Sequence, residues 1–251
     1  SRQRVQATAT GLELGRQLTR RLGSIADTLE RLRRPSAAAS TVVLSASSAF
    51  CHYWLAPRLR RLRQALPGIS LRLVARDPYV DLESEEVDIA IRYGGGHWRR
   101  LTAMPFFDEA VVPVCSRTYL AGTGLPRRPA DYRRHTLLHY DSLNANWLSW
   151  NDWFAAAGLP PARIETTLSF SSYQDVLEAA LAGVGIAIGW RRIVGRLLAD
   201  GKLIALSDQP LRPRDRYWLV TPRWREASRA AQKLREWLRA EAVAEPLWPP
   251  T

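Results

Sequence analysis

The stretch TVVLSASSAF at residues 41–50 decides the fold class of this chain. It opens as an apolar run of strand length and continues through Ser47 and Ser48 into a long pattern with helical spacing. A proline-glycine break, a second apolar run and a third run from Val87 follow. Strand, helix and further strands in this order are typical of α/β architecture with mostly parallel sheets.

The same alternation continues to the end of the chain. The predicted strands lie near residues 41–46, 69–75, 87–92, 107–114, 136–140, 164–170, 184–188 and 216–221. The predicted helices lie near residues 50–66, 80–85, 129–133, 147–157, 172–182, 190–199 and 225–242. Glycine clusters at 94–96 and 183–185 predict sharp turns beside strands.

Composition indicates a folded protein with a sizeable core. The chain has 251 residues, 46% of them hydrophobic, and ten tryptophans. No apolar run approaches the roughly 18 residues that a membrane-spanning helix needs. Its two cysteines, Cys51 and Cys115, lie far apart and fit small buried hydrophobic positions better than a redox pair.

The formal charge of +12 is concentrated toward the N-terminus, because residues 1–40 contain eight arginines and only three acids. In the same segment, a heptad of apolar or small residues forms one narrow seam of the kind that pairs with another helix. Its members are Gly11, Gly15, Leu18, Leu22, Ile25, Leu29 and Leu32. An amphipathic helix packed on its own domain is the alternative interpretation. Residues 35–40, PSAAAS, read as a hinge-like linker.

Several segments together resemble the LysR-type family of bacterial transcription regulators. VQATATG at 5–11 is similar to the end of that family's DNA-binding winged helix. VDIAIRYGGGHW at 87–98 and VPVCS at 112–116 resemble one branch, which includes activators of glycine cleavage and of chromosomal β-lactamase. AGVGIAIGW at 182–190 is similar to the family's glycine turn before the last helix of the second lobe.

This resemblance implies a two-lobed, periplasmic-binding-protein-like α/β effector domain preceded by a dimerisation helix. Residues 1–40 would hold the end of the winged-helix domain, the dimerisation helix and the hinge. Lobe I would comprise 41–112 plus 213–245, and lobe II 113–212. The implied protein is a cytoplasmic homodimer or homotetramer without a membrane partner. It would bind DNA through a winged helix-turn-helix absent from this chain, and a small-molecule effector between the lobes.

The cleft between the lobes is where ligands of such sheets bind, outside the carboxyl ends of strands. Hydroxyl and backbone N–H groups at two helix starts could bind a polar or anionic group there, although simple helix capping uses the same geometry. The remaining candidates follow strands, where a plain turn or core packing is the alternative. The candidate ligand-binding residues are Ser47, Ser48, Asp77, Tyr79, Tyr93, Trp98, Ser171, Ser172 and Trp190.

No catalytic or metal-binding pattern stands out. The chain has no G-x-S-x-G elbow, phosphate-cradling glycine loop or HExxH helix. The acids between residues 81 and 88 suggest a solvated face, and the four histidines lack compact ligand spacing. We therefore expect no enzyme, cofactor or metal. The rivals to a regulator are a solute-binding protein of a transporter and an enzyme on the same fold, such as a deaminase or dehydratase.

Overall fold

The computed structural model describes residues 8, 10–11, 15, 17–18, 41–77, 82, 86–141, 147–160 and 168–244. The chain divides into two compact units, residues 1–41 and 42–251. Most of the predicted heptad helix, all of the linker 35–40, and Tyr79 lie outside the described residues. The strands and helices of the two lobes lie in the second unit, except that Thr41, the first residue of β1, is counted with the first unit.

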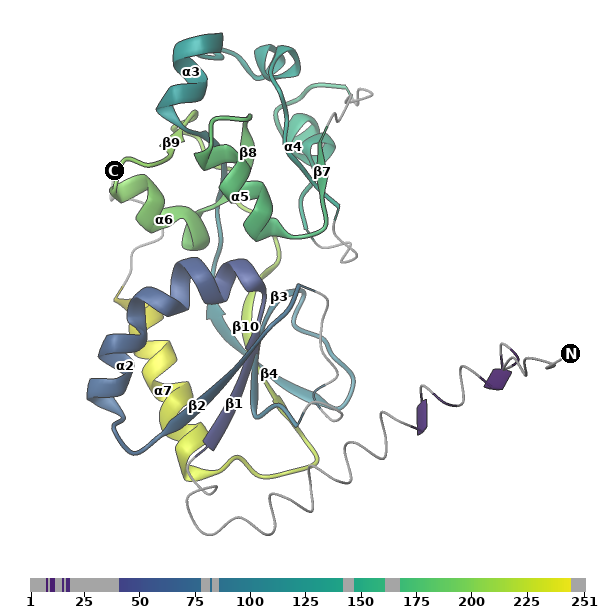
Figure 1. Cartoon of the computed structure of the whole chain (residues 1–251), viewed down its shortest axis with the longest axis vertical. Coiled ribbons are helices and arrows are strands. Elements are labelled where there is room, and N and C mark those ends of the chain that lie inside the picture. The colour runs from purple at the N-terminus through teal and green to yellow at the C-terminus, as the bar shows by residue number, and fades with distance from the viewer. Residues whose placement is uncertain are drawn as a thin grey trace, which may run out of the picture. The chain divides into compact units, whose positions relative to one another are not determined.

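The first lobe is built on a five-stranded sheet of order β2-β1-β3-β10-β4 (Figure 1). Its strands are β1 (Thr41–Ala46), β2 (Ser70–Ala75), β3 (Ile89–Gly94), β4 (Leu101–Phe107) and β10 (Arg216–Pro222). Its helical segments are η2 (Phe50–Leu55), η3 (Ala56–Arg58), α2 (Leu59–Ala65) and α7 (Arg229–Val243). Strands β1 and β3 run parallel, with Leu44 opposite Ile89, whereas β10 is antiparallel to both of its neighbours.

The second lobe surrounds a three-stranded sheet of order β8-β5-β9, which is antiparallel throughout. These strands are β5 (Val111–Cys115), β8 (Ala187–Trp190) and β9 (Ile204–Ala205), and a parallel pair is formed by β6 (His139–Tyr140) and β7 (Ser169–Phe170). The helical segments of this lobe are α3 (Arg117–Thr123), η4 (Pro129–Arg134), α4 (Trp150–Ala156), α5 (Tyr173–Leu181) and α6 (Arg191–Ala199).

The predicted helix near 50–66 is confirmed, although it forms in three steps of different pitch. The Ser47 hydroxyl accepts the Phe50 N–H at 3.3 Å and caps the helix start. A π-helical turn then leads into a 3-10 turn near Pro57, which lacks an N–H to donate to the preceding turn. Trp54 and Leu62 are buried on one face, so burial holds this irregular helix against the sheet.

The chain crosses between the lobes twice, and the two crossings lie side by side. Residues 108–110 join β4 to β5, and the segment after β9 returns to β10. Val111 and Leu211 exchange N–H···O bonds of 2.8 and 2.9 Å between the crossings. An ion pair of 3.1 Å joins Arg216 to Asp108. The paired crossings therefore form the covalent connection about which the lobes would move.

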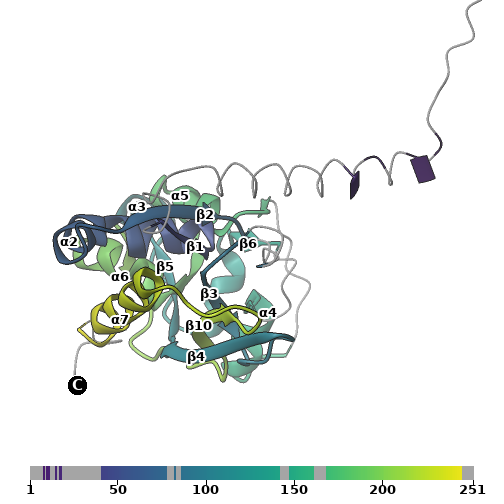
Figure 2. The same cartoon turned by 90° about the horizontal axis from the view of Figure 1, so that it is seen from below.

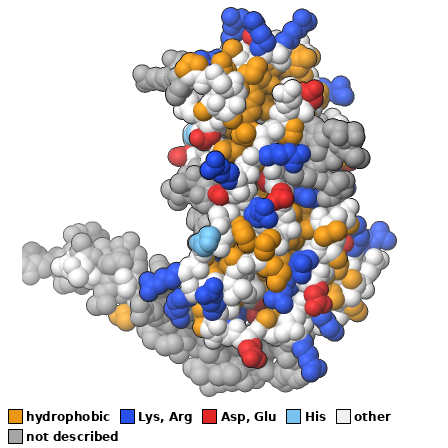
Figure 3. Space-filling model, turned by 180° about the vertical axis from the view of Figure 1, so that it is seen from behind, with side chains coloured by type: hydrophobic (Ala, Val, Ile, Leu, Met, Phe, Trp, Pro, Cys, Tyr) orange, Lys and Arg blue, Asp and Glu red, His pale blue; other side chains and the backbone are white. Residues whose placement is uncertain are grey.

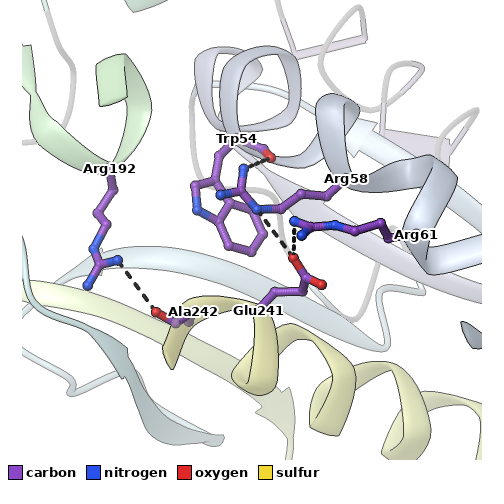
Figure 4. A network of polar contacts seen from close by, with 6 residues as sticks. All are labelled: Trp54, Arg58, Arg61, Arg192, Glu241 and Ala242. Atoms are coloured by element: carbon purple, nitrogen blue, oxygen red, sulfur yellow. Dashed lines mark hydrogen bonds and ion pairs between the residues drawn. The ribbon is translucent and has the colours of Figure 1, made fainter. Parts of the chain in front are cut away.

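A network of polar contacts ties the C-terminal helix to the rest of the molecule (Figure 4). Glu241 on α7 forms ion pairs with Arg58 and Arg61, and α7 lies beside α2 (Figures 1 and 2). The Arg58 guanidinium stacks over Trp54 at 4.3 Å from the ring centroid. Helix α7 is thus packed into the first lobe, far in sequence from the strands and helices that it contacts.

The main core is one continuous buried cluster that includes residues of both lobes, such as Leu44, Val112 and Leu177. A smaller cluster around Val87 and Val220 includes residues of β2, β3, β4 and β10. No helix among the described residues combines the length and apolar character needed to cross a membrane.

Two predictions from the sequence were wrong, and three elements were missed. The sheets are not mostly parallel: β10 is antiparallel to β3 and β4, and the three-stranded sheet is antiparallel throughout. The predicted strand 107–114 is broken by residues 108–110 at the first crossing, and β4 precedes that break. Strands β4 and β9 and helix α3 were not predicted. Pro105 within β4 and the short β9 weaken the strand pattern there.

Both predicted glycine turns are confirmed. Gly96 has a φ of 86° and Gly183 a φ of 80°, values that residues with a side chain rarely adopt. A Cβ on Gly96 would also collide with the Trp218 ring at 2.5 Å. These turns allow the chain to reverse in tightly packed surroundings.

We expect Gly185→Ala to destabilise the protein, because a Cβ at this position would lie 2.5 Å from the Thr136 carbonyl oxygen. Overpacking of this kind costs about 1–3 kcal/mol. The control is Gly122→Ala on α3, where nothing lies within 4 Å of an added Cβ. This control is expected to stabilise the helix by about 0.5–1 kcal/mol. Thermal unfolding of the full chain measures both, and a Gly185→Ala variant as stable as the parent would contradict the described turn.

Candidate functional site

Two helix starts from different lobes meet at one carboxylate. Asp77, just after β2, accepts the Ser48 N–H at 2.9 Å and the Tyr173 N–H at 3.3 Å through its two oxygens. Ser48 opens the helix of the first lobe, and Tyr173 is the first residue of α5 in the second lobe. A carboxylate is favoured at a helix N-terminus by the free N–H groups and the helix dipole. The two helix starts that the sequence analysis singled out therefore meet at Asp77.

A second hydrogen bond spans the lobes farther along the same helices. The Tyr53 hydroxyl donates to the Glu178 carboxylate at 2.7 Å. Burial, together with the bond to Glu178, raises the pKa of Tyr53 far above its ordinary value. The phenol therefore keeps its proton at neutral pH and remains a donor.

Aromatic side chains from both lobes pack against one another beside the pocket that Asp77 lines. Tyr93 on β3 contacts Trp190 on β8 edge to face, with ring centroids 4.7 Å apart. The Trp147 ring centroid lies 4.5 Å from that of Trp190 and 5.4 Å from that of Tyr173. The ring centroids of Tyr217 and Tyr93 are 5.3 Å apart. Such contacts add about 0.5–1.5 kcal/mol per pair beyond burial, so this wall contributes to closure.

The pocket beside these rings is almost filled. Its cavity volume is about 20 Å³, room for one or two water molecules rather than for a metabolite. Its lining combines aromatic rings with charges of both signs. The lining residues are Ser45, Ala46, Ser47, Arg76, Asp77, Ala90, Ile91, Arg92, Tyr93, Trp147 and Tyr217.

The predicted site residues divide into three groups. Ser47, Asp77 and Tyr93 line the pocket, and Ser48 and Trp190 contact the residues that line it. Ser172 precedes α5 without a cap bond from its side chain, and Ser171 beside it is exposed. Trp98 packs instead beside the smaller cluster, with the Arg92 guanidinium 5.8 Å from its ring centroid.

Sequence reasoning missed Tyr173, whose backbone and hydroxyl both connect parts of the site. The hydroxyl donates to the Ile188 carbonyl at 2.7 Å and accepts the Trp190 N–H at 3.1 Å. Complete burial raises the pKa of Tyr173 well above its ordinary value. Its place directly after two serines at a helix start was the only signal available. Arg76, Arg92 and Tyr217 were also missed, since nothing in their local pattern separates them from other strand residues.

The first crossing carries a buried carboxyl group. Glu109 is only 2% exposed, and its oxygens accept the N–H groups of Ala110 and Arg192 at 2.9 and 3.0 Å. It thereby caps the start of α6. Burial raises the pKa of Glu109 from 4.5 to about 8, although these N–H donors and the Arg192 charge oppose that shift.

Arg192 connects α6 to the first lobe. Its guanidinium lies 4.8 Å from the Phe107 ring centroid and 3.5 Å from the Ala242 carbonyl oxygen near the end of α7 (Figure 4). A cation is favoured beside the carbonyls at a helix C-terminus. The crossing between the lobes is thus surrounded by contacts from α6, α7 and β4.

The two cysteine thiols do not suit a reactive site. Burial raises the pKa of the Cys51 and Cys115 thiols to about 11, so both remain protonated at neutral pH. Within the part of the chain that the structure describes, no three His, Cys, Asp or Glu side chains gather into a possible metal site. A larger hollow of about 330 Å³ lies between η2, α5 and α6, with His52, Glu178, Arg196 and Lys202 in its lining. None of the predicted site residues that the structure describes lines it.

Positive charge does not gather into one patch on the face shown in Figure 3. Lys and Arg side chains are spread along this face, with Asp and Glu side chains between them. The formal charge of +12 therefore does not by itself identify a nucleic-acid surface on this face.

The sequence pattern of the family described as "LysR substrate binding domain" matches residues 36–243. The chain is 30% identical over 208 residues to the glycine cleavage system transcriptional activator of Escherichia coli K12, covering 83% of this chain and 67% of the relative. It is 33% identical over 211 residues to the transcriptional activator AmpR of Pseudomonas aeruginosa, covering 81% of this chain and 67% of that protein.

Solved structures agree with this relationship. The effector domain of Pseudomonas aeruginosa AmpR superimposes with a TM-score of 0.70 at 31% identity, covering 81% of this chain and 96% of that one. The AmpR effector-binding domain of Citrobacter freundii gives a TM-score of 0.71 at 26% identity, covering 82% and 100%. The predicted two-lobed fold and the predicted family are both confirmed by these comparisons.

We expect the free energy of unfolding to fall as pH rises between about 4.5 and 8, because the folded state holds the Glu109 proton more tightly than the unfolded state. Below this window the carboxyl is protonated in both states; above it, the buried carboxylate is penalised. Glu109→Gln should flatten this decline in denaturant titrations at pH 5, 6.5 and 8. Asp108→Asn, which removes an exposed ion pair with Arg216, is the control. Equal pH slopes for parent and Glu109→Gln would refute the assignment.

Proposed function

This chain belongs to the LysR family of transcriptional regulators and contains its effector-binding domain, and from that premise we propose that a small-molecule effector binds in the pocket beside Asp77. One observation carries the proposal: the starts of two helices from different lobes converge on that pocket, together with aromatic rings from both lobes. Such a place binds a polar ligand and reports its presence as a change in lobe closure.

The lining suits a small polar effector. Arg76 can pair with an acidic group, Asp77 can accept from a donor group, and Tyr93 and Trp147 offer ring faces. The cavity of about 20 Å³ requires the lobes to separate before such a molecule enters. The limits of 41–112 plus 213–245 and of 113–212 for the two lobes are part of this proposal, and the first crossing at 108–110 lies near the first of them.

Regulators of this family bind DNA and respond to small molecules. For this chain we propose that effector binding changes how the lobes or subunits are arranged, and that a winged helix-turn-helix outside these 251 residues responds to that change. A cytoplasmic location and the absence of enzymatic activity are parts of the same proposal. A solute-binding protein of a transporter is not favoured, because the matching relatives are transcription regulators.

Thermal-shift screening of the full chain against amino acids, betaines, aromatic acids and cell-wall peptides should yield a stabilising compound. A ligand at 100 times its dissociation constant stabilises a protein by about 2.7 kcal/mol. Trp147→Ala, which opens the aromatic wall, should weaken the binding of that compound by about tenfold or more, or about 1.4 kcal/mol. Isothermal titration calorimetry measures the change.

Trp224→Ala is the matched control, because Trp224 is 38% exposed and stacks on Arg100 rather than lining the pocket. Its affinity should stay within about twofold of the parent. Equal losses in the two variants would place the compound elsewhere, and unchanged affinity in Trp147→Ala would remove the pocket from the proposal.

We propose that the heptad seam of residues 11–32 joins two chains into a homodimer, which can pair further into a homotetramer. Leu22→Asp with Leu29→Asp places charges in the seam and should lower the mass seen by sedimentation equilibrium. Ser24→Asp lies off the seam and should leave the mass unchanged. If deletion of residues 1–40 left the oligomeric state unaltered, the seam would have no part in association.

A further inference from the structure

We propose that Asp77 is an internal latch of the effector cleft: its carboxylate holds the two lobes together when no ligand is bound, and an effector must displace it. This inference rests on the proposed function, because it concerns the regulation of the same pocket. In this proposal the Asp77 side chain keeps the lobes closed in the absence of effector. Neither the family relationship nor the fold specifies which residue does so.

Asp77 makes one hydrogen bond within its own lobe and a second, longer one to the other lobe. Its bond to the Ser48 N–H lies within the first lobe and measures 2.9 Å, whereas its bond to the Tyr173 N–H crosses to the second lobe and measures 3.3 Å. When the lobes part, the carboxylate keeps the shorter bond and loses the longer one. Asp77 therefore stays in place on the first lobe and can close again on α5.

The chemistry of the two donors explains why a carboxylate can act as a latch. Each donor is a backbone N–H in the first turn of a helix, where no intrahelical acceptor is available. A single carboxylate has an oxygen for each of them, and both helix dipoles favour its negative charge. An amide side chain would present only one acceptor, and its N–H₂ group would face the second donor.

The surrounding structure supports a closed resting state. The pocket holds only about 20 Å³ of free space, and the Tyr53–Glu178 bond spans the lobes beside the latch. An effector that enters must first separate α5 from Asp77. Its apparent affinity is then reduced by the small fraction of molecules that are open, so the latch sets the effector concentration at which the sensor responds.

The latch can be tested by measuring the distance between the lobes without any effector. Spin labels on Arg72→Cys in β2 and Ala121→Cys in α3 occupy exposed positions, while Cys51 and Cys115 are buried. The labelled full chain is diluted with unlabelled chain, so that double electron–electron resonance reports pairs within one molecule. Asp77→Ala should shift the distance distribution to longer values than in the parent.

Two further variants separate the latch from general loss of stability. Asp152→Ala removes the carboxylate that pairs with Ser149 at the start of α4, within the second lobe, and should keep the parent distance. Ser48→Pro deletes the anchoring N–H at the first helical position, where proline is tolerated, and should open the lobes as Asp77→Ala does. Ser48→Ala retains the N–H and should remain closed.

Free acetate supplies the missing carboxylate and tests its chemistry directly. Excess sodium acetate, compared with sodium chloride at the same ionic strength, should return Asp77→Ala toward the parent distance and leave the parent unchanged. A closed distribution in both Asp77→Ala and Ser48→Pro, or an open Asp77→Ala that acetate does not close, would overturn the latch. Neither result depends on the ligand screen, so failure of the screen and failure of the latch are distinguishable.

Discussion

The carboxylate of Asp77 accepts N–H groups from two helices that are separated by 125 residues of sequence, from Ser48 to Tyr173. This contact requires the end of β2, the start of the first helix and the start of α5 to meet at one point. Helix starts leave N–H groups without intrahelical partners, so their approach would be unfavourable without an acceptor between them. When the two helix starts meet at Asp77, the lobes lie close together. The nearly filled pocket and the contact between Tyr93 and Trp190 fit that arrangement.

The crossings supply the complementary constraint. Val111 and Leu211 bind each other through their backbones, so the lobes share a two-stranded connection rather than a flexible linker. Glu109 and Arg192 fix the start of α6 against that connection, and Arg192 also reaches the end of α7. A movement of one lobe would therefore be transmitted to α6 and α7 together. Buried polar contacts of this kind favour a few discrete arrangements over continuous bending.

The Asp77 contact and the paired crossings both bear on how an effector domain of this family could respond to a ligand. Transcription regulators related to this chain have effector domains of the same fold. The charges of both signs in the pocket lining would be costly to bury without polar partners. Their gathering between the lobes is best explained by a pocket that exchanges its internal contacts for those of an effector.

The sequence by itself determined the alternation of strands and helices, the turns at Gly96 and Gly183 and the serine-rich helix starts, because each depends on neighbours in the chain. The motifs at 87–98 and 182–190 were also sufficient to indicate the family. Only the tertiary structure decided that β10 runs antiparallel, that Trp98 packs away from the pocket and that Tyr173 belongs to it. It alone showed that Asp77 joins both lobes. Those features depend on contacts between residues far apart in the sequence, and local pattern contains no information about which distant groups will meet.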